Sequence, residues 1–235
     1  MSKQEKPGGG YRTVTCCYGR LRDVHITIKE EYLSKIPIPE WLYGAGDGRG
    51  TRENAKAHQG KKHHFVTDLK SFFPRTSHGR VYRVFTSVLG FTPDAARIAT
   101  RLTTYDGGLP QGTHTSPRLA DLAFLQVDRQ LDQFCKQERI TYTRYVDDLS
   151  FSSPHPFQSR VPEIKAIIND GNNRYRVHQG AKTYYTTGPV EITGIVVYNN
   201  RIRVPKVLID RWSQLPPESP EWQGLHNYIL HVERG

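Results

Sequence analysis

Two adjacent aspartates, Asp147 and Asp148, separate two runs of aromatic and β-branched residues at positions 140–146 and 149–152. Such runs predict strands, and the short polar break predicts a β-hairpin with two carboxylates at its turn. Like charges a few ångströms apart repel strongly, so this turn is costly unless a cation lies beside it. A solvated turn is the ordinary explanation of one Asp pair, but the surrounding sequence argues against it.

A third carboxylate, Asp68, comes near the end of a short apolar-flanked run at 64–69 that predicts another strand. A folded sheet could bring Asp68 to Asp147 and Asp148 and so collect the oxygen donors that Mg²⁺ prefers. Two such ions about 4 Å apart stabilise both the attacking and the leaving oxygen in phosphoryl transfer. We therefore expect a site for two Mg²⁺ ions, which Mn²⁺ can replace.

Helix-start signals recur along the chain. Thr92 followed by Pro93 predicts a helix that runs to about residue 104. Ser116 and Pro117 repeat this pattern, and apolar residues at helical spacing then predict a long amphipathic core helix. A third helix is expected near Pro162. Helices mixed with hairpins predict an α+β fold.

The remaining segments give weaker signals. Residues 1–10 are polar and glycine-rich and predict a flexible arm, whereas residues 11–28 resemble strand structure. Residues 195–198 and 201–204 flank two asparagines and predict a second hairpin. The proline-rich tail is expected to be irregular up to a short segment at 222–232.

The composition favours a polyanionic partner. The chain of 235 residues has 33 Lys and Arg against 23 Asp and Glu, a formal net charge of +10, which favours nucleic acid through phosphate neutralisation. Three cysteines without CxxC pairs give neither a zinc site nor a disulfide framework. No apolar run reaches the roughly 18 residues of a membrane span. We expect a cytoplasmic protein without a membrane partner.

Five segments, taken in order, resemble the reverse transcriptase family, in particular its bacterial retron and group II intron members. The resemblance covers about residues 43–204. It is carried by GDGRGTRENAKAH, DLKSFFP, GLPQGTHTSPRLADLAF, YTRYVDDLSFS, and the stretch from Lys182 to TGIVVYN.

The resemblance implies roles for the acidic residues. Asp68 and Asp147 correspond to the main metal ligands, with Asp148 beside them and the Leu69 carbonyl as an extra oxygen. Lys182 matches a lysine that neutralises or protonates the pyrophosphate leaving group. These roles are expectations from the family.

The resemblance also implies nucleotide contacts. Phe73 falls where the family places an aromatic gate that clashes with a ribose 2′-hydroxyl, and core packing is the alternative role. Gln111 and Gly112 match the segment that supports the incoming nucleotide. Arg49 matches a position that grips the triphosphate, since a guanidinium fork suits phosphate oxygens, and a surface charge is its alternative.

Primer and template contacts are implied for Pro110, Tyr145 and Val146. The YVDD sequence departs from the YADD common in bacterial members, which places a β-branched residue beside the primer end.

The implied architecture is the fingers and palm of a right-hand polymerase, in which an antiparallel palm sheet packs on helices, with a reduced or truncated thumb. Only about 30 residues follow the second hairpin. We therefore expect RNA, a protein partner or a second copy to supply the clamp, unless the sequence is a fragment. The expected parts are an arm at 1–10, fingers at 11–64 and within 75–105, a palm at 65–205 and a thumb stub at 206–235.

The implied function is RNA-directed DNA polymerisation with dNTPs as substrates, an RNA template and a DNA product. The retron-like motifs point to a structured non-coding RNA and to anti-phage defence. Two alternatives stay open: template-independent or protein-primed DNA synthesis, and a non-catalytic RNA-binding subunit of a larger polymerase complex.

Overall fold

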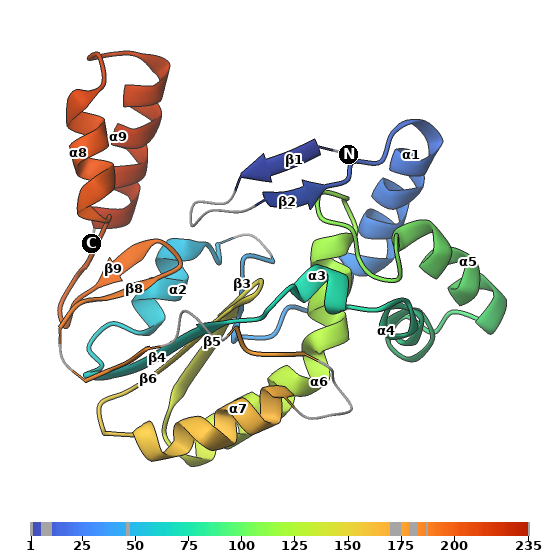
Figure 1. The fold of residues 1–235 in the computed structure, drawn as a ribbon, viewed down its shortest axis with the longest axis horizontal. Coiled ribbons are helices and arrows are strands. Elements are labelled where there is room, and N and C mark those ends of the chain that lie inside the picture. Colours follow the sequence, from blue (N-terminus) through green and yellow to red (C-terminus); the bar gives the residue numbers. More distant parts are fainter. Residues whose placement is uncertain are drawn as a thin grey trace. The chain divides into compact units, whose positions relative to one another are not determined.

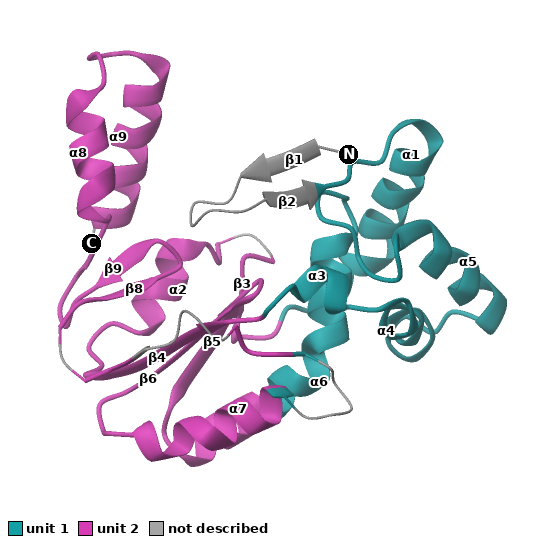
Figure 2. Ribbon diagram, viewed as in Figure 1, with its two compact units in different colours: residues 1–38, 70–130, 169–175 teal, residues 39–69, 131–168, 176–235 magenta. Residues whose placement is uncertain are grey.

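The computed structural model describes residues 2–5, 11–45, 48–169, 175–178, 183–186 and 188–234. The chain divides into two compact units (Figure 2). The first unit contains residues 1–38, 70–130 and 169–175, and the second contains residues 39–69, 131–168 and 176–235. These units do not coincide with the expected fingers, palm and thumb boundaries, which stay predictions.

A five-stranded sheet forms the centre of the second unit (Figure 1). Its strand order is β3-β5-β6-β4-β7, and all neighbours are antiparallel except β3 and β5, which run parallel. The strands are β3 (Leu42–Tyr43), β4 (His63–Asp68), β5 (Thr141–Tyr145), β6 (Asp148–Ser153) and β7 (Thr183–Tyr185).

The two faces of this sheet differ in chemistry. On one face, Phe65, Phe151 and Tyr142 are neighbours across three strands, and their ring centroids lie 5.6 and 5.0 Å apart. Lys165 of α7 (Val161–Asn169) covers the Phe65 ring there. Strand residues alternate between faces, so Ser152 lies on the opposite face, where it contacts His58.

Helix α2 (Thr51–Ala57) lies on this second, polar face (Figure 1). His58, which ends the helix, is fully buried and bonds Ser152 Oγ at 2.6 Å and Thr143 Oγ1 at 2.7 Å. Thr143 in turn donates to Asn54 Oδ1 at 2.6 Å. Buried polar groups need such partners, so these bonds fix how α2 sits on the sheet.

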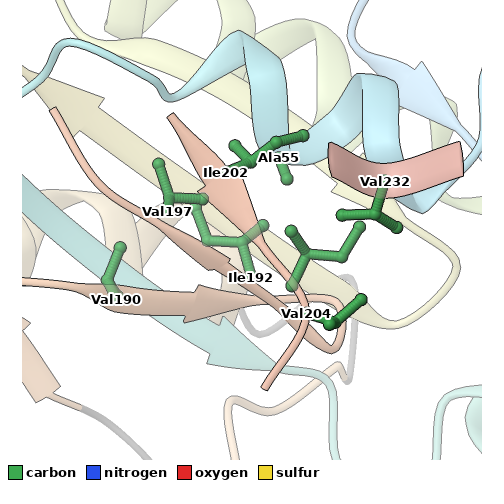
Figure 3. Close-up of a cluster of buried hydrophobic side chains, with 8 residues drawn as sticks. Ala55, Val190, Ile192, Val197, Ile202, Val204 and Val232 are labelled. Carbon is green, nitrogen blue, oxygen red and sulfur yellow. The ribbon is translucent and has the colours of Figure 1, made fainter. Parts of the chain in front are cut away.

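A small sheet and two helices complete the second unit. The sheet order is β10-β9-β8, and Figure 3 shows its apolar side chains packed with Ala55 of α2 and Val232 of α9. This cluster ties the C-terminal helices to α2. The elements are β8 (Val190–Ile192), β9 (Ile195–Val197), β10 (Ile202–Arg203), α8 (Lys206–Gln214) and α9 (Pro220–Glu233).

The first unit is mainly helical. Its core includes Phe72, whose ring packs against Phe124 and Tyr175 at centroid distances of 5.8 and 5.7 Å. Helix α6 begins here and runs on into the second unit. The elements are β1 (Ser2–Glu5), β2 (Tyr11–Val14), α1 (Gly19–Ile28), a π-type turn at Lys29–Leu33, α3 (Phe72–Arg75), α4 (His78–Arg83), a second π-type turn at Val84–Val88, α5 (Pro93–Thr103) and α6 (Ser116–Gln137).

Most of the expected elements are present. The hairpin at Asp147, the helix that begins after Thr92, the long helix from Ser116 and the hairpin at 195–204 are confirmed. Thr92 caps α5 as expected, since its hydroxyl accepts the Ala95 N–H. Among the described residues, no helix is long and apolar enough to cross a lipid bilayer.

Three expectations differ from the structure. Gly19–Ile28 is a helix and not a strand. Its His25 is buried and bonds the Leu102 carbonyl and Thr115, and such tertiary contacts override the low helix propensity of β-branched residues. In the expected flexible arm, Ser2–Glu5 pairs with β2 as strand β1. The tail expected to be irregular contains α8.

His58 gives the fold an acid sensitivity. Burial lowers the pKa of His58 from 6.5 to about 3. Below pH 6.5 the unfolded chain therefore binds a proton that the folded chain does not bind, and stability falls until about pH 3. By pH 5 this loss is about 2 kcal/mol.

We expect urea unfolding at pH 7.5 and pH 5 to show a larger loss of stability for the wild type than for His58→Gln, which has no such titration. Equal losses in the two proteins would contradict this assignment.

Candidate active site

Two of the three predicted carboxylates face each other across neighbouring strands. Asp68 is the last residue of β4, Asp148 is the first of β6, and the antiparallel register pairs them directly. Directly opposed residues have Cβ atoms about 4.5–5.5 Å apart on one face of the sheet. Asp147 lies in the turn just before, and its carbonyl accepts the Leu69 N–H at 2.9 Å. The turn is thus fastened to the end of β4.

The electrostatics of this group disfavour full ionisation. Burial, and then the negative charges of Asp147 and Asp68, raise the pKa of Asp148 from 3.8 to about 7. Near neutral pH, the three carboxylates are therefore stabilised by a proton or by a cation.

The donor set fits a hard divalent cation. All the candidate ligands, including the Leu69 carbonyl, are oxygens, which Mg²⁺ prefers, and Mg²⁺ keeps several waters or substrate oxygens in its shell. Within the described ranges, no three His, Cys, Asp or Glu side chains form a metal cage by themselves.

The turn that holds Asp147 has an unusual backbone. Val146 has a positive φ of 56°, which is unfavourable for a β-branched residue. The fully buried Arg144 donates to the Val146 carbonyl at 2.7 Å. A Cβ on Gly44 would lie 2.8 Å from the Tyr145 ring, so only glycine fits at position 44 without a shift. These contacts hold both predicted primer-contact residues, Tyr145 and Val146.

Arg49 also belongs to the second unit. It is half-buried, its guanidinium donates to the Pro39 carbonyl, and its own carbonyl accepts the Gly44 N–H at 2.7 Å. These contacts place Arg49 just before α2 and leave its predicted triphosphate contact a prediction.

Four other predicted residues, Phe73, Pro110, Gln111 and Gly112, belong to the first unit. The Leu109 N–H donates to the Phe73 carbonyl at 3.2 Å, which brings Phe73 next to the segment that contains Pro110. Phe73 is half-buried, whereas its neighbour Phe72 is in the core.

Gln111 and Gly112 are held by the end of β2. The Gln111 carbonyl accepts the Thr15 N–H at 2.7 Å. Gly112 has a φ of 101°, and a Cβ on it would lie 2.6 Å from Val14 Cγ1, so glycine is needed at this position. Lys182 lies outside the described residues.

Several residues at the site had no predicted role. Arg144 supports the turn carbonyl of Val146 and is one of the largest fully buried side chains. A lone basic residue inside a predicted strand, two positions before the turn, was a signal that could have indicated it. Asn54 and His58 appeared in the family motif, but no contact was assigned to them.

Comparisons with known proteins show what this chain is similar to. The family model described as reverse transcriptase (RNA-dependent DNA polymerase) matches residues 4–196. The Mx162 retron reverse transcriptase of Myxococcus xanthus is 30% identical over 220 residues, which cover 82% of this chain and 45% of that protein.

The Se72 retron reverse transcriptase of Salmonella heidelberg is 29% identical over 158 residues, which cover 67% of this chain and 42% of that protein. The chain thus spans about half the length of the curated relatives it matches.

Solved structures share the fold. A foamy viral protease-reverse transcriptase in complex with dsDNA has a TM-score of 0.57 at 18% identity, over 96% of this chain and 41% of that one. Telomerase from Candida albicans, in complex with a fragment of telomeric RNA, has a TM-score of 0.56 at 10% identity, over 90% and 45%. These likenesses confirm the predicted fold class. Together with the family match over residues 4–196, they lead to one conclusion: this chain belongs to the reverse transcriptase family.

Proposed function

We propose that the chain is an RNA-directed DNA polymerase that adds dNTPs to the 3′ end of a primer. The observation that carries this proposal is the pairing of Asp68 with Asp148, with Asp147 in the adjoining turn, in a chain of the reverse transcriptase family. The names of the retron relatives support the same reaction.

In the proposed reaction, the primer 3′-hydroxyl loses its proton to water, and its oxygen forms a bond to the α-phosphorus of the dNTP. The bond from that phosphorus to its bridging oxygen breaks, and pyrophosphate leaves. Asp68, Asp147 and Asp148, with the Leu69 carbonyl, would hold two Mg²⁺ or Mn²⁺ ions, which supply charge stabilisation to the attacking and leaving oxygens when bound. The backbone bond between Leu69 and Asp147 keeps these donors together.

Other residues would orient the nucleotide. Arg49 and Lys182 are proposed to neutralise the triphosphate and the leaving pyrophosphate. Gln111 and Gly112 would lie along the nucleotide, and Phe73 would exclude a 2′-hydroxyl. The partial exposure of Phe73, beside a fully buried Phe72, supports this gate role.

The template is proposed to be a structured non-coding RNA in a retron-like anti-phage defence system. The similarity to named retron reverse transcriptases supports this setting. Tyr145, Val146 and Pro110 would contact the primer and template. A bound RNA, a protein partner or a second copy is proposed to help clamp the duplex.

The polymerase proposal predicts a metal-dependent loss of activity at the turn. Asp147→Ala is expected to lower incorporation of labelled dNTP on an RNA template roughly 1,000-fold, because an ion ligand is removed. Asp94→Ala, at a side chain that is 85% exposed, is the matched control and should keep full activity. If the wild type incorporates no dNTP on any primed RNA with Mg²⁺ or Mn²⁺, the proposal fails. A product that copies none of the RNA present would instead favour template-independent synthesis.

The carboxylate repulsion predicts a stability effect that does not depend on activity. At pH 8 without divalent ions, Asp148→Asn should melt about 3–8 °C above the wild type, because it removes a partly buried like charge worth about 1–3 kcal/mol. Its stabilisation by Mg²⁺ should be smaller than that of the wild type. Thermal unfolding with and without Mg²⁺ measures both effects, with Asp94→Asn as control. An unchanged Mg²⁺ shift would argue against Asp148 as a ligand.

The gate role of Phe73 predicts altered sugar selection. Phe73→Ala should reduce the preference for dNTP over rNTP by about 10- to 100-fold, because the clash with the 2′-hydroxyl is removed. Primer extension with each nucleotide measures kcat/KM for both. Tyr105→Ala, at an aromatic side chain that is 56% exposed, should keep the wild-type preference. Unchanged selectivity in Phe73→Ala would assign Phe73 to core packing.

A further inference from the structure

Asn54 joins two hairpins of the second unit. Its side chain is fully buried. On one side, its Oδ1 accepts the hydroxyl of Thr143, on strand β5, at 2.6 Å. On the other side, its Nδ2 donates to the hydroxyl oxygen of Thr193, in the turn between β8 and β9, at 3.3 Å. The Asn54 amide thus bonds both the β5–β6 hairpin, whose turn holds Asp147, and the small sheet.

These bonds belong to a series of hydrogen bonds in which the donor and the acceptor are fixed at each step. A hydroxyl has one proton, and Thr143 gives its proton to Asn54, so Thr143 must accept from His58 Nε2–H at 2.7 Å. His58 Nδ1 then accepts the proton of Ser152 at 2.6 Å. Donation therefore runs from Ser152 through His58, Thr143 and Asn54, and Thr193 is the final acceptor.

Thr193 has a strained backbone conformation. Its φ is 47°, a left-handed conformation that is unfavourable for a β-branched residue and that glycine or asparagine would adopt more easily. Strained residues are retained where surrounding contacts impose them, and they gather at functional sites. Here the strain coincides with the hydroxyl that accepts from Asn54.

The two ends of the Asn54 contact bear on different parts of the unit. Thr143 lies two residues before Tyr145, which pairs with Asp148. Thr193 lies in the hairpin whose apolar residues pack with Val232 of α9 (Figure 3). If the β8–β9 hairpin, which packs with α9, shifts relative to strand β5, the Asn54 bonds therefore have to stretch or break.

We propose that Asn54 and Thr193 form a positioning pair for the polymerase reaction, an inference that rests on the proposed function. Through the Asn54 bond to Thr143, the pair fixes the β8–β9 hairpin relative to strand β5, which pairs with the strand that carries Asp148. It acts through this hairpin and not by touching substrate. A misplacement of about 1 Å that is caused by a mutation far from the reacting atoms lowers the rate on the order of 100-fold. A small shift of the hairpin is therefore expected to slow the reaction.

The test uses substitutions that separate position from stability. Thr193→Gly removes the hydroxyl but also relieves the positive φ, so its melting temperature should stay within about 3 °C of the wild type. Thr193→Ser keeps the hydroxyl and is the matched control. We expect Thr193→Gly to lower kcat for dNTP incorporation about tenfold, with KM for dNTP within about twofold of the wild type. Thr193→Ser, which keeps the hydroxyl, should have the kcat of the wild type.

A double-mutant cycle locates the effect. Asn54→Ala should lower kcat at least as much as Thr193→Gly, because it also removes the bond to Thr143. The double variant should lower kcat no further than Asn54→Ala alone, because the contact with Thr193 is already lost. Additive losses would overturn the pairing. A Thr193→Gly enzyme with wild-type kcat would overturn the positioning role, as would a loss of kcat that merely follows a loss of melting temperature. If Asn54→Ala does not fold, the Gly and Ser variants of Thr193 decide alone.

Amide hydrogen exchange separates this proposal from the proposed function. Residues 190–197 should exchange faster in Thr193→Gly than in Thr193→Ser, whether or not the protein polymerises DNA. If exchange is faster in Thr193→Gly than in Thr193→Ser but the wild type has no polymerase activity, the bridge is supported and the reaction is rejected. Equal exchange in the two variants would reject the bridge, even in an active enzyme.

Discussion

The register between β4 and β6 is the constraint on which the candidate site depends. It pairs Asp68 with Asp148 at one end of the strands and, three positions inward, Phe65 with Phe151. Because side chains alternate along a strand, a slip of one residue would move each set to the other face. The apolar stacking of Phe65 and Phe151 therefore also holds the two carboxylates in opposition, against their mutual repulsion.

The two faces of the sheet make this register unambiguous. One face is aromatic and is covered by α7, whereas the other presents Ser152 and Thr143 to the buried imidazole of His58. Exchanging the faces would bury hydroxyls without partners on one side and place aromatic rings against the buried imidazole of His58 on the other, and both changes are costly. The polar contacts thus add specificity to a sheet whose stability comes mainly from its apolar face.

Local patterns in the sequence predicted the elements that local physics determines. The helix-start signals at Thr92 and Ser116 and the aromatic and β-branched runs beside Asp147 are short-range signals, and the corresponding helices and hairpin are present. The α1 helix was missed because the burial of His25 against residues distant in sequence decides its conformation.

The candidate site was predictable only in part. The three carboxylates followed from their residue type and from the family motifs. The contact of Asn54 with Thr193 joins residues 139 positions apart, whose proximity depends on the backbone path. Single-sequence patterns do not contain that path. The partition of the nucleotide-contact residues between two units was likewise not encoded in motif order.

The positive φ of Val146 has a consequence for the order of folding. A turn that its own residues disfavour is a poor starting point for a hairpin, since hairpins usually begin at turns with glycine or asparagine at such positions. The β5–β6 turn therefore gains stability from the end of β4, where the Leu69 N–H donates to the Asp147 carbonyl, and this contact requires the surrounding sheet. We expect the acidic end of this sheet to become ordered late in folding, after its aromatic face has formed.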